Sequence, residues 1–218
     1  MKQELKYWVA LSMISGVGVV LTRSLLSEFD SAEAIFKAST KSLVQINGIN
    51  VKTAESIKAF NEWDKVDQEL EKVEKWNINL LPLNDPKYPR PLFQTYNPPL
   101  LLYVKGEILE QDELSIAIVG SRLPDRYGRT VAATLSSELA SLGITIVSGL
   151  ARGIDSIAQA AAIEAGGRTI GVLACGIDQI YPPEIKNYIQ QFQRMAQLFL
   201  SFLWGLRPFQ PISREETG

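Results

Sequence analysis

The apolar residues of the C-terminal half repeat as strand, helix, strand, helix, strand. Three short runs of apolar and β-branched residues have the length of buried strands. They are residues 114–120, 144–149 and 168–176. The intervening segments, 129–143 and 156–167, have helical spacing and end in glycine, and Asp155 or Ser156 is the expected N-cap of the second. Such alternation predicts an α/β fold, a Rossmann-like doubly wound parallel sheet with right-handed crossovers over residues 114–193.

In residues 1–79 the apolar positions recur at helical spacing, in short segments. Glycine turns interrupt these segments at Gly16 to Gly18 and at Asn47 to Asn50. The pattern predicts a small all-helical domain, similar to SAM-like helix-hairpin-helix pairs, whose turn amides can face a phosphate. The same glycines also suit tight connections that only pack a helical bundle. Asn50 stands where the second hairpin should have its second glycine.

Residues 80–113 have a different composition from the segments on either side. They hold most of the prolines of the chain and several aromatic residues. Because proline removes a backbone donor and fixes φ, we expect no helix here, whereas the run LLLYVKG at 100–106 suits a short strand. We therefore expect a connector with one short strand.

Composition excludes several kinds of chemistry. The chain of 218 residues has no histidine and one cysteine, Cys175, which lies in an apolar run. Histidine relays and imidazole metal sites are excluded, no intramolecular disulfide can form, and we expect neither a catalytic group nor a metal nor a cofactor. Lys and Arg number 22 against 24 Asp and Glu, so any nucleic-acid site must be local. Without a long apolar run or a signal peptide, a cytoplasmic protein is expected.

Candidate chemistry gathers in the loops after the predicted strands, where parallel sheets bind ligands. Neither a dinucleotide fingerprint nor a P-loop is present there. Glycines would let an anion approach the backbone, amides would carry partial positive charge, and arginines would grip phosphate oxygens, so a phosphate pocket is predicted. Tyr181 could stack on a base. The candidate DNA- or phosphate-binding residues are Gly120, Ser121, Arg122, Ser148, Gly149, Arg152, Gly153, Asp155 and Tyr181.

A plainer interpretation of these loops stays open. The glycines could serve only to make turns, and the arginines could pair with Asp125, Asp155 or Asp178. Tyr181 could pack against its own turn. No two carboxylates have a spacing that indicates acid–base catalysis.

The ordered segments DPKYPRPL, NPPLLLYVKG, IAIVGSR, SGLARGIDSIAQ and GIDQIYPPE resemble the DNA-processing protein A family, DprA or Smf, over residues 1–193. In that family a helical domain precedes a Rossmann-like domain that binds single-stranded DNA without cleaving it. The resemblance implies a DNA-binding protein, not an enzyme, that protects incoming DNA and loads a RecA-type recombinase in natural transformation. It also implies a homodimer, and it places a histidine where this chain has Gln159. The alternative is a nucleotide or nucleoside hydrolase on a lysine-decarboxylase-like Rossmann fold.

Residues 194–218 depart from the family pattern and show neither helical nor strand periodicity. Codons permitted for this stretch, read one frame over, can encode NGAIISEFPLGT and, one residue later, PFPANFPRRNR, which resembles the next family segment. A frameshift near residue 193 would truncate the Rossmann domain, leave a sheet edge unpaired and impair or abolish function. A stop codon in the shifted frame would refute this hypothesis.

Overall fold

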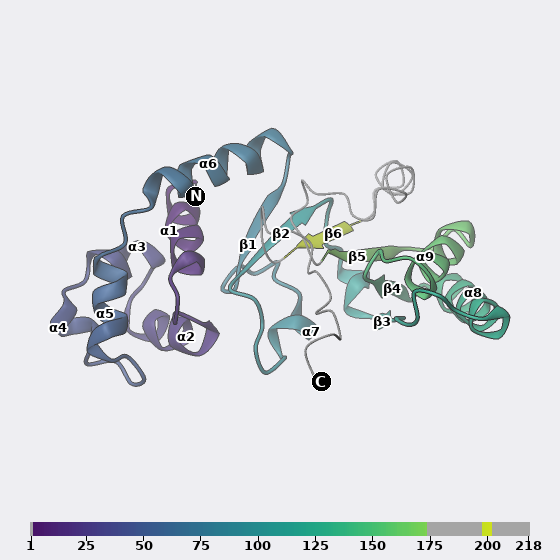
Figure 1. The fold of residues 1–218 in the computed structure, drawn as a ribbon, viewed down its shortest axis with the longest axis horizontal. Helices are drawn as coiled ribbons and strands as arrows, with labels where there is room; N and C mark the ends of the chain where they lie inside the picture. The colour runs from purple at the N-terminus through teal and green to yellow at the C-terminus, as the bar shows by residue number, and fades with distance from the viewer. Residues whose placement is uncertain (1, 174–197, 202–218) are drawn as a thin grey trace, which may run out of the picture. The chain divides into compact units, whose positions relative to one another are not determined.

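The structure is a computed structural model that describes residues 2–173 and 198–201. The chain forms two compact units, Met1–Leu102 and Tyr103–Gly218. Figure 1 shows the described helices and strands in chain order. The division falls inside strand β2 (Leu101–Lys105), whereas the sequence places domain boundaries near residues 80 and 114.

The N-terminal unit begins with the helical domain that the sequence predicts. Its helices are α1 (Lys2–Met13), α2 (Val19–Glu28), α3 (Ala32–Lys37), α4 (Thr40–Leu43), α5 (Val51–Lys58) and α6 (Trp63–Lys75). Trp8, Leu25 and Ile35 are fully buried between them. Burial of such large apolar side chains is the main stabilising contribution to a bundle of short helices.

Both predicted glycine turns adopt backbone conformations that favour glycine. Gly16 has φ +85° and Gly48 has φ +86°, the left-handed region in which a Cβ is unfavourable. Asn50 is the N-cap of α5, and its Oδ1 accepts a hydrogen bond from the amide of Thr53 at 2.8 Å. Asn50 therefore gives the Thr53 amide a hydrogen-bond acceptor that a glycine at this position would lack.

The connector contains more regular structure than expected. It forms β1 (Asn79–Pro82), helix α7 (Arg90–Phe93), β2 and the 3₁₀-helix η1 (Glu110–Glu113). The expectation of no helix is wrong, because α7 follows Pro89 and carries a proline only in its first turn. Proline is tolerated there, since the first amides of a helix have no partner within it.

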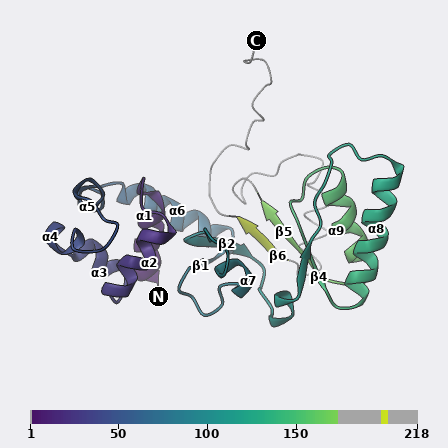
Figure 2. The same cartoon turned by 90° about the horizontal axis from the view of Figure 1, so that it is seen from below.

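The C-terminal unit confirms the alternating α/β pattern. Its elements are β3 (Ser115–Ala117), α8 (Arg126–Ser141), β4 (Thr145–Ser148), α9 (Ile154–Glu164), β5 (Thr169–Leu173) and β6 (Leu198–Ser201). The strands follow the order β2-β6-β5-β4-β3, with β3 to β6 parallel and β2 antiparallel to β6. Helices α8 and α9 lie together on one side of the parallel strands (Figures 1 and 2). Right-handed crossovers between successive neighbours place them there.

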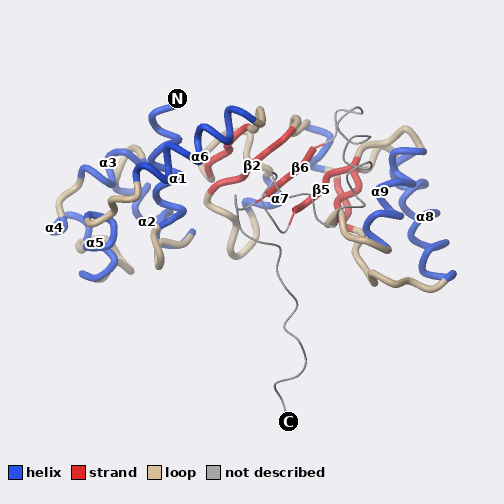
Figure 3. The backbone as a smooth tube through the Cα atoms, turned by 45° about the horizontal axis from the view of Figure 1, so that its top comes forward, coloured by secondary structure: helices blue, strands red, loops and turns tan. Residues whose placement is uncertain are grey.

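Strand β6 overturns one expectation. Residues 198–201 lie in the segment predicted to have no strand, yet they pair with β5 on one side and with β2 on the other (Figure 3). The edge of β5 is therefore paired, and the predicted unpaired edge is not there. Among the described strands of this unit, β3 is last in the order.

The solvent-facing side of α8 carries apolar residues at every fourth position. Tyr127, Val131 and Leu135 are all exposed, and Ile116 on β3 is 40% exposed. Exposed apolar faces beside an edge strand promote association.

We expect the protein to self-associate as its concentration rises. Leu135→Lys should reduce the mean particle mass that light scattering measures. Thr134→Lys adds the same charge at an exposed polar position, so equal effects of both variants would contradict the prediction.

Candidate nucleic-acid interface

Two loops at the carboxyl ends of β3 and β4 are in direct backbone contact. The amide of Ile154 donates to the carbonyl of Ser121 at 3.1 Å. Gly153 has φ +87°, and a Cβ placed on it would lie 2.2 Å from that same carbonyl oxygen. At Gly120 a Cβ would lie 2.7 Å from Ile154 Cγ1. The two glycines thus allow the loops to approach each other closely.

Two predicted site residues, Ser148 and Asp155, are buried and stabilise the two loops through hydrogen bonds to the backbone. The Ser148 hydroxyl is buried and donates to the carbonyl of Ile118 at 2.6 Å. The Asp155 carboxylate is buried as well, and its Oδ2 accepts from the amide of Gly149 at 3.1 Å. Asp155 is not the N-cap of α9, as the sequence suggested, because Gly153 occupies that position.

The backbone amides predicted to face a phosphate are largely used within the protein. The amides of Gly149, Ile154, Ser156 and Gly128 donate to Asp155 Oδ2, Ser121 O, Ala151 O and Asp125 Oδ1 respectively. Even the Ser121 hydroxyl oxygen accepts a hydrogen bond, from the amide of Leu123 at 3.1 Å. Of the candidate residues, Gly149 therefore has no free amide to offer an anion, and anion recognition at these positions depends on side chains instead.

Arginines supply the positive charge. Arg122 is exposed, and so are Arg126 and Arg129 in the first turns of α8, which the sequence analysis did not single out. Among the residues that the structure describes, the Arg122 and Arg126 side chains form no ion pair or hydrogen bond, while Arg129 Nε donates to Pro124 O at 3.3 Å. The spacing of positions 126 and 129 was the available signal, because residues three apart share a helix face.

Neither Asp125 nor Asp155 neutralises Arg122. Asp125 caps α8 by accepting from the amide of Gly128 at 2.7 Å, and Asp155 is bound to the amide of Gly149. The pairing alternative is therefore not observed for Arg122 with either of them. Arg152, on the second loop, is exposed too. Asp178 and Tyr181 lie outside the described residues.

Apolar and aromatic side chains accompany these arginines. Leu123 and Tyr127 are exposed, Tyr127 at 77%. Leu150, by contrast, is buried and has φ +55°. A left-handed leucine costs roughly 1 kcal/mol, and such conformations gather at functional sites. The second loop is thus held at its centre by a buried side chain, with Arg152 exposed beyond it.

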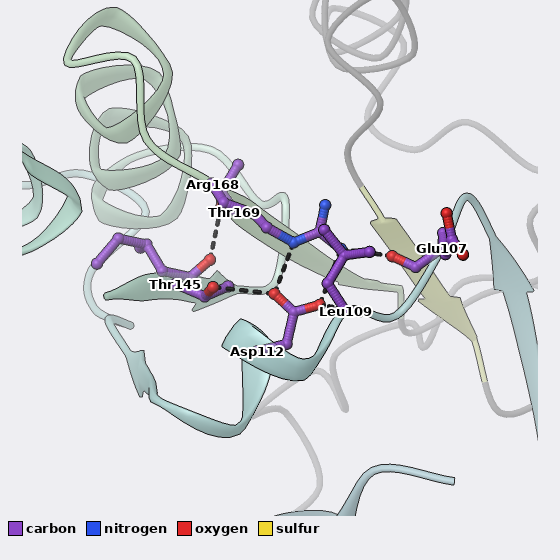
Figure 4. Close-up of polar contacts among 7 residues, drawn as sticks. Glu107, Leu109, Asp112, Thr145, Arg168 and Thr169 are labelled. Carbon is purple, nitrogen blue, oxygen red and sulfur yellow. Dashed lines mark hydrogen bonds and ion pairs between the residues drawn. The ribbon is translucent and has the colours of Figure 1, made fainter. Parts of the chain in front are cut away.

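At the opposite ends of β4 and β5 a polar network braces the unit (Figure 4). Arg168 binds both carboxylate oxygens of Asp112, Nε to Oδ1 at 2.6 Å and Nη2 to Oδ2 at 2.8 Å. Thr145 Oγ1 also donates to Asp112 Oδ1 at 2.9 Å, and the amide of Leu109 donates to Oδ2 at 2.9 Å. Arg168 matches the charge of Asp112, and both carboxylate oxygens already accept hydrogen bonds. This network therefore stabilises the fold rather than binding a ligand.

The described residues form neither a metal-ligand cluster nor a membrane-spanning helix. No group of three histidine, cysteine, aspartate or glutamate residues in ranges 2–173 and 198–201 could hold a metal ion. Within the same ranges, none of the helices has the length and apolar character needed to span a membrane.

The sequence of this chain is similar to those of known proteins named Smf or DNA processing protein. The DNA recombination-mediator protein A family matches residues 79–213, and the SAM-like helix-hairpin-helix tandem matches residues 9–60. Protein Smf of Synechocystis is 34% identical over 94% of this chain and 52% of its own length. DNA processing protein DprA of Bacillus subtilis is 36% identical over 78% of this chain and 58% of its own. This chain thus spans about half the length of these curated relatives.

Solved structures extend the similarity to the fold. DNA processing protein A from Streptococcus pneumoniae superposes with a TM-score of 0.74 at 26% identity, over 94% of this chain and 70% of that protein. The family match also includes residues 194–213, although this segment lacks the motifs expected there from the resemblance. From the matched residues and the shared fold together, the chain belongs to the DNA recombination-mediator protein A family.

Proposed function

We propose that this chain binds single-stranded DNA through Arg122, Arg126, Arg129 and Arg152, as a DNA-processing protein without enzymatic activity. The observation that carries the proposal is the exposure of these arginines: Arg122 and Arg152 lie on two loops joined by the Ile154 to Ser121 hydrogen bond, and Arg126 and Arg129 lie at the start of α8. Arginine forks bind phosphate oxygens, and an exposed aromatic such as Tyr127 offers a stacking surface for unpaired bases. Ordered loops lower the entropic cost of binding.

The proposed partners are those that the resemblance suggests. We propose that the bound strand is handed to a RecA-type recombinase during natural transformation, and that the protein acts as a homodimer in the cytoplasm. Ser148 and Asp155 belong to this site as buried supports, and Gly120, Ser121, Gly149 and Gly153 form its backbone. A frameshift near residue 193 remains a hypothesis, which the nucleotide sequence tests.

The Arg122→Ala, Arg152→Ala double variant tests the DNA site. We expect weaker binding to a fluorescent oligo(dT) in anisotropy titrations. The plot of log affinity against log salt should lose about 0.7 of slope per phosphate contact, roughly 1.4 in total. Because both side chains are exposed, the fold should be unchanged by circular dichroism.

Arg122→Lys is the matched control for charge. It keeps the positive charge but not the planar fork, so it should retain the salt slope and lose part of the affinity. An unchanged slope in the double variant would refute the DNA site. Turnover of nucleotides in a hydrolysis assay would refute the non-enzymatic role.

A further inference from the structure

A second cationic and aromatic surface lies in the N-terminal unit, on the segment 84–97 around α7. Its centre is Phe93, whose side chain is 44% exposed. The Arg23 guanidinium lies over this ring, 4.8 Å from the centroid, and Arg23 Nη2 donates to the Phe93 carbonyl at 3.1 Å. A cation over an aromatic face and a hydrogen bond to the same residue fix both groups.

The ring is also supported from within the unit. Tyr88 meets Phe93 edge to face, with centroids 6.4 Å apart. Tyr88 is buried, and its hydroxyl donates to the carbonyl of Pro99 at 2.8 Å. Burial raises the pKa of this hydroxyl further above neutrality, in keeping with its role as a hydrogen-bond donor. Tyr88 therefore holds the Phe93 ring in place from the buried side, while the other part of the ring is exposed.

Tyr96 stands three residues further on and is 94% exposed. The backbone before it is held by hydrogen bonds from the Thr95 amide and hydroxyl to the carbonyl of Leu92, the latter at 2.7 Å. Pro98 and Pro99 restrict the chain after it. A large aromatic ring left in water on an ordered loop is a ready stacking partner.

The charge of the segment is positive. Lys87 and Arg90 are exposed, and within the described part of the chain their side chains form no ion pair or hydrogen bond. Asp85 is the one carboxylate of segment 84–97, and its Oδ1 accepts from the amide of Lys87 at 2.8 Å. Cations interleaved with exposed rings match a single-stranded nucleic acid, because cations track the phosphates and rings stack on the bases.

We propose that Phe93 and Tyr96, with Arg23, Lys87 and Arg90, form a base-stacking subsite for single-stranded DNA on the N-terminal unit. The proposal rests on the proposed function in that the ligand is the same strand. It adds a contact region outside the Rossmann-like unit, made by a connector that would otherwise only join two domains.

Photo-cross-linking tests the subsite directly. An oligonucleotide carrying 5-iodouracil should cross-link to the tryptic fragment 88–105, with the adduct on Tyr96. Tyr96→Ala should remove that adduct and weaken oligo(dT) binding roughly tenfold, the loss expected for one stacked base. Tyr96→Phe keeps the ring and should bind as the unaltered chain does. Tyr96→Leu keeps apolar area without the ring and should bind weakly. Because Tyr96 is almost fully exposed, the thermal midpoint should not change in any variant.

The outcomes separate this subsite from the Rossmann-like site. If Tyr96→Ala binds normally and fragment 88–105 carries no adduct, while Arg122→Ala, Arg152→Ala binds weakly, the subsite is refuted and the proposed function stands. If the arginine variants bind normally while Tyr96→Ala binds weakly, the subsite is supported and the arginine site is refuted. Cross-links in 88–105 that Tyr96→Leu retains in full would also overturn a stacking role.

Discussion

Arg168→Ala is expected to destabilise the C-terminal unit by about 3–5 kcal/mol, because it leaves a carboxylate buried without its counter-charge. The side chains of Arg168 and Asp112 are only 12% and 5% exposed. Their bidentate contact joins the 3₁₀-helix η1 to the start of β5, and Thr145 links the same carboxylate to β4. Loss of the guanidinium removes a charge pair and leaves the desolvation cost of Asp112.

Hydrogen exchange at the amides of β4 and β5 is the appropriate measurement, since two compact units need not unfold together. Protection should fall by two orders of magnitude or more. Arg126→Ala is the control, because it removes an exposed arginine without an ion pair among the described residues, and it should change stability by less than about 0.5 kcal/mol. Asp112→Leu combined with Arg168→Met should recover much of the loss. A loss below about 1 kcal/mol in Arg168→Ala would contradict the assigned role.

Gly153→Ala is expected to separate the two arginine loops and so weaken DNA binding at least as much as the loss of Arg122. The new Cβ would lie 2.2 Å from Ser121 O and 2.8 Å from the Arg122 backbone. Neither contact can be relieved by a side-chain rotation, because both involve backbone atoms. With φ +87° and ψ −128°, the residue also occupies a region open mainly to glycine. The free energy of unfolding should fall by at least about 2 kcal/mol.

Gly166→Ala separates the effect of the steric clash from the effect of the positive φ. Gly166 has φ +74°, but a Cβ there meets nothing within 4 Å. This variant also places a Cβ at a positive φ but without a clash, so it should cost about 1 kcal/mol and leave DNA binding intact. Thermal unfolding and anisotropy titrations of both variants are the measurements. Equal DNA affinity of Gly153→Ala and the unaltered chain would show that contact between the loops is irrelevant to binding.

The C-terminal elements could be predicted because strand and helix have different apolar periods, and each change of period marks a boundary. Helix α8 ends at a glycine, Gly143, with φ +82°, as the sequence indicates. Short elements escaped the same reasoning. One turn of helix in α7 and four residues of β6 are too short to show a period, and β6 is specified by pairing with two distant strands rather than by its own pattern.

The contact between the two candidate loops could be predicted, but the bonding of their amides could not. Parallel strand ends had to meet at one edge of the sheet, so Arg122 and Arg152 could be assigned to one region. Whether an amide is free depends on which acceptor the fold brings to it. Asp155 reaches back to Gly149, and Ser121 O reaches Ile154, through tertiary contacts that no local pattern specifies. Arg126 and Arg129 were accessible to sequence reasoning through their spacing alone.

The pairing of β2 with β6 has a consequence for the order of folding. Lys105 lies opposite Phe199, so this pairing closes a loop of about ninety residues, whereas β3 to β4, β4 to β5 and β5 to β6 join over about twenty to thirty residues each. Long loops are slower to close and gain their contacts late. Strands β3 to β6, with helices α8 and α9, can therefore form first, and β2 then pairs with the open edge of β6. Until it does, the facing edges of β6 and β2 both expose unpaired backbone, and the nascent chain is most vulnerable to aggregation during that interval.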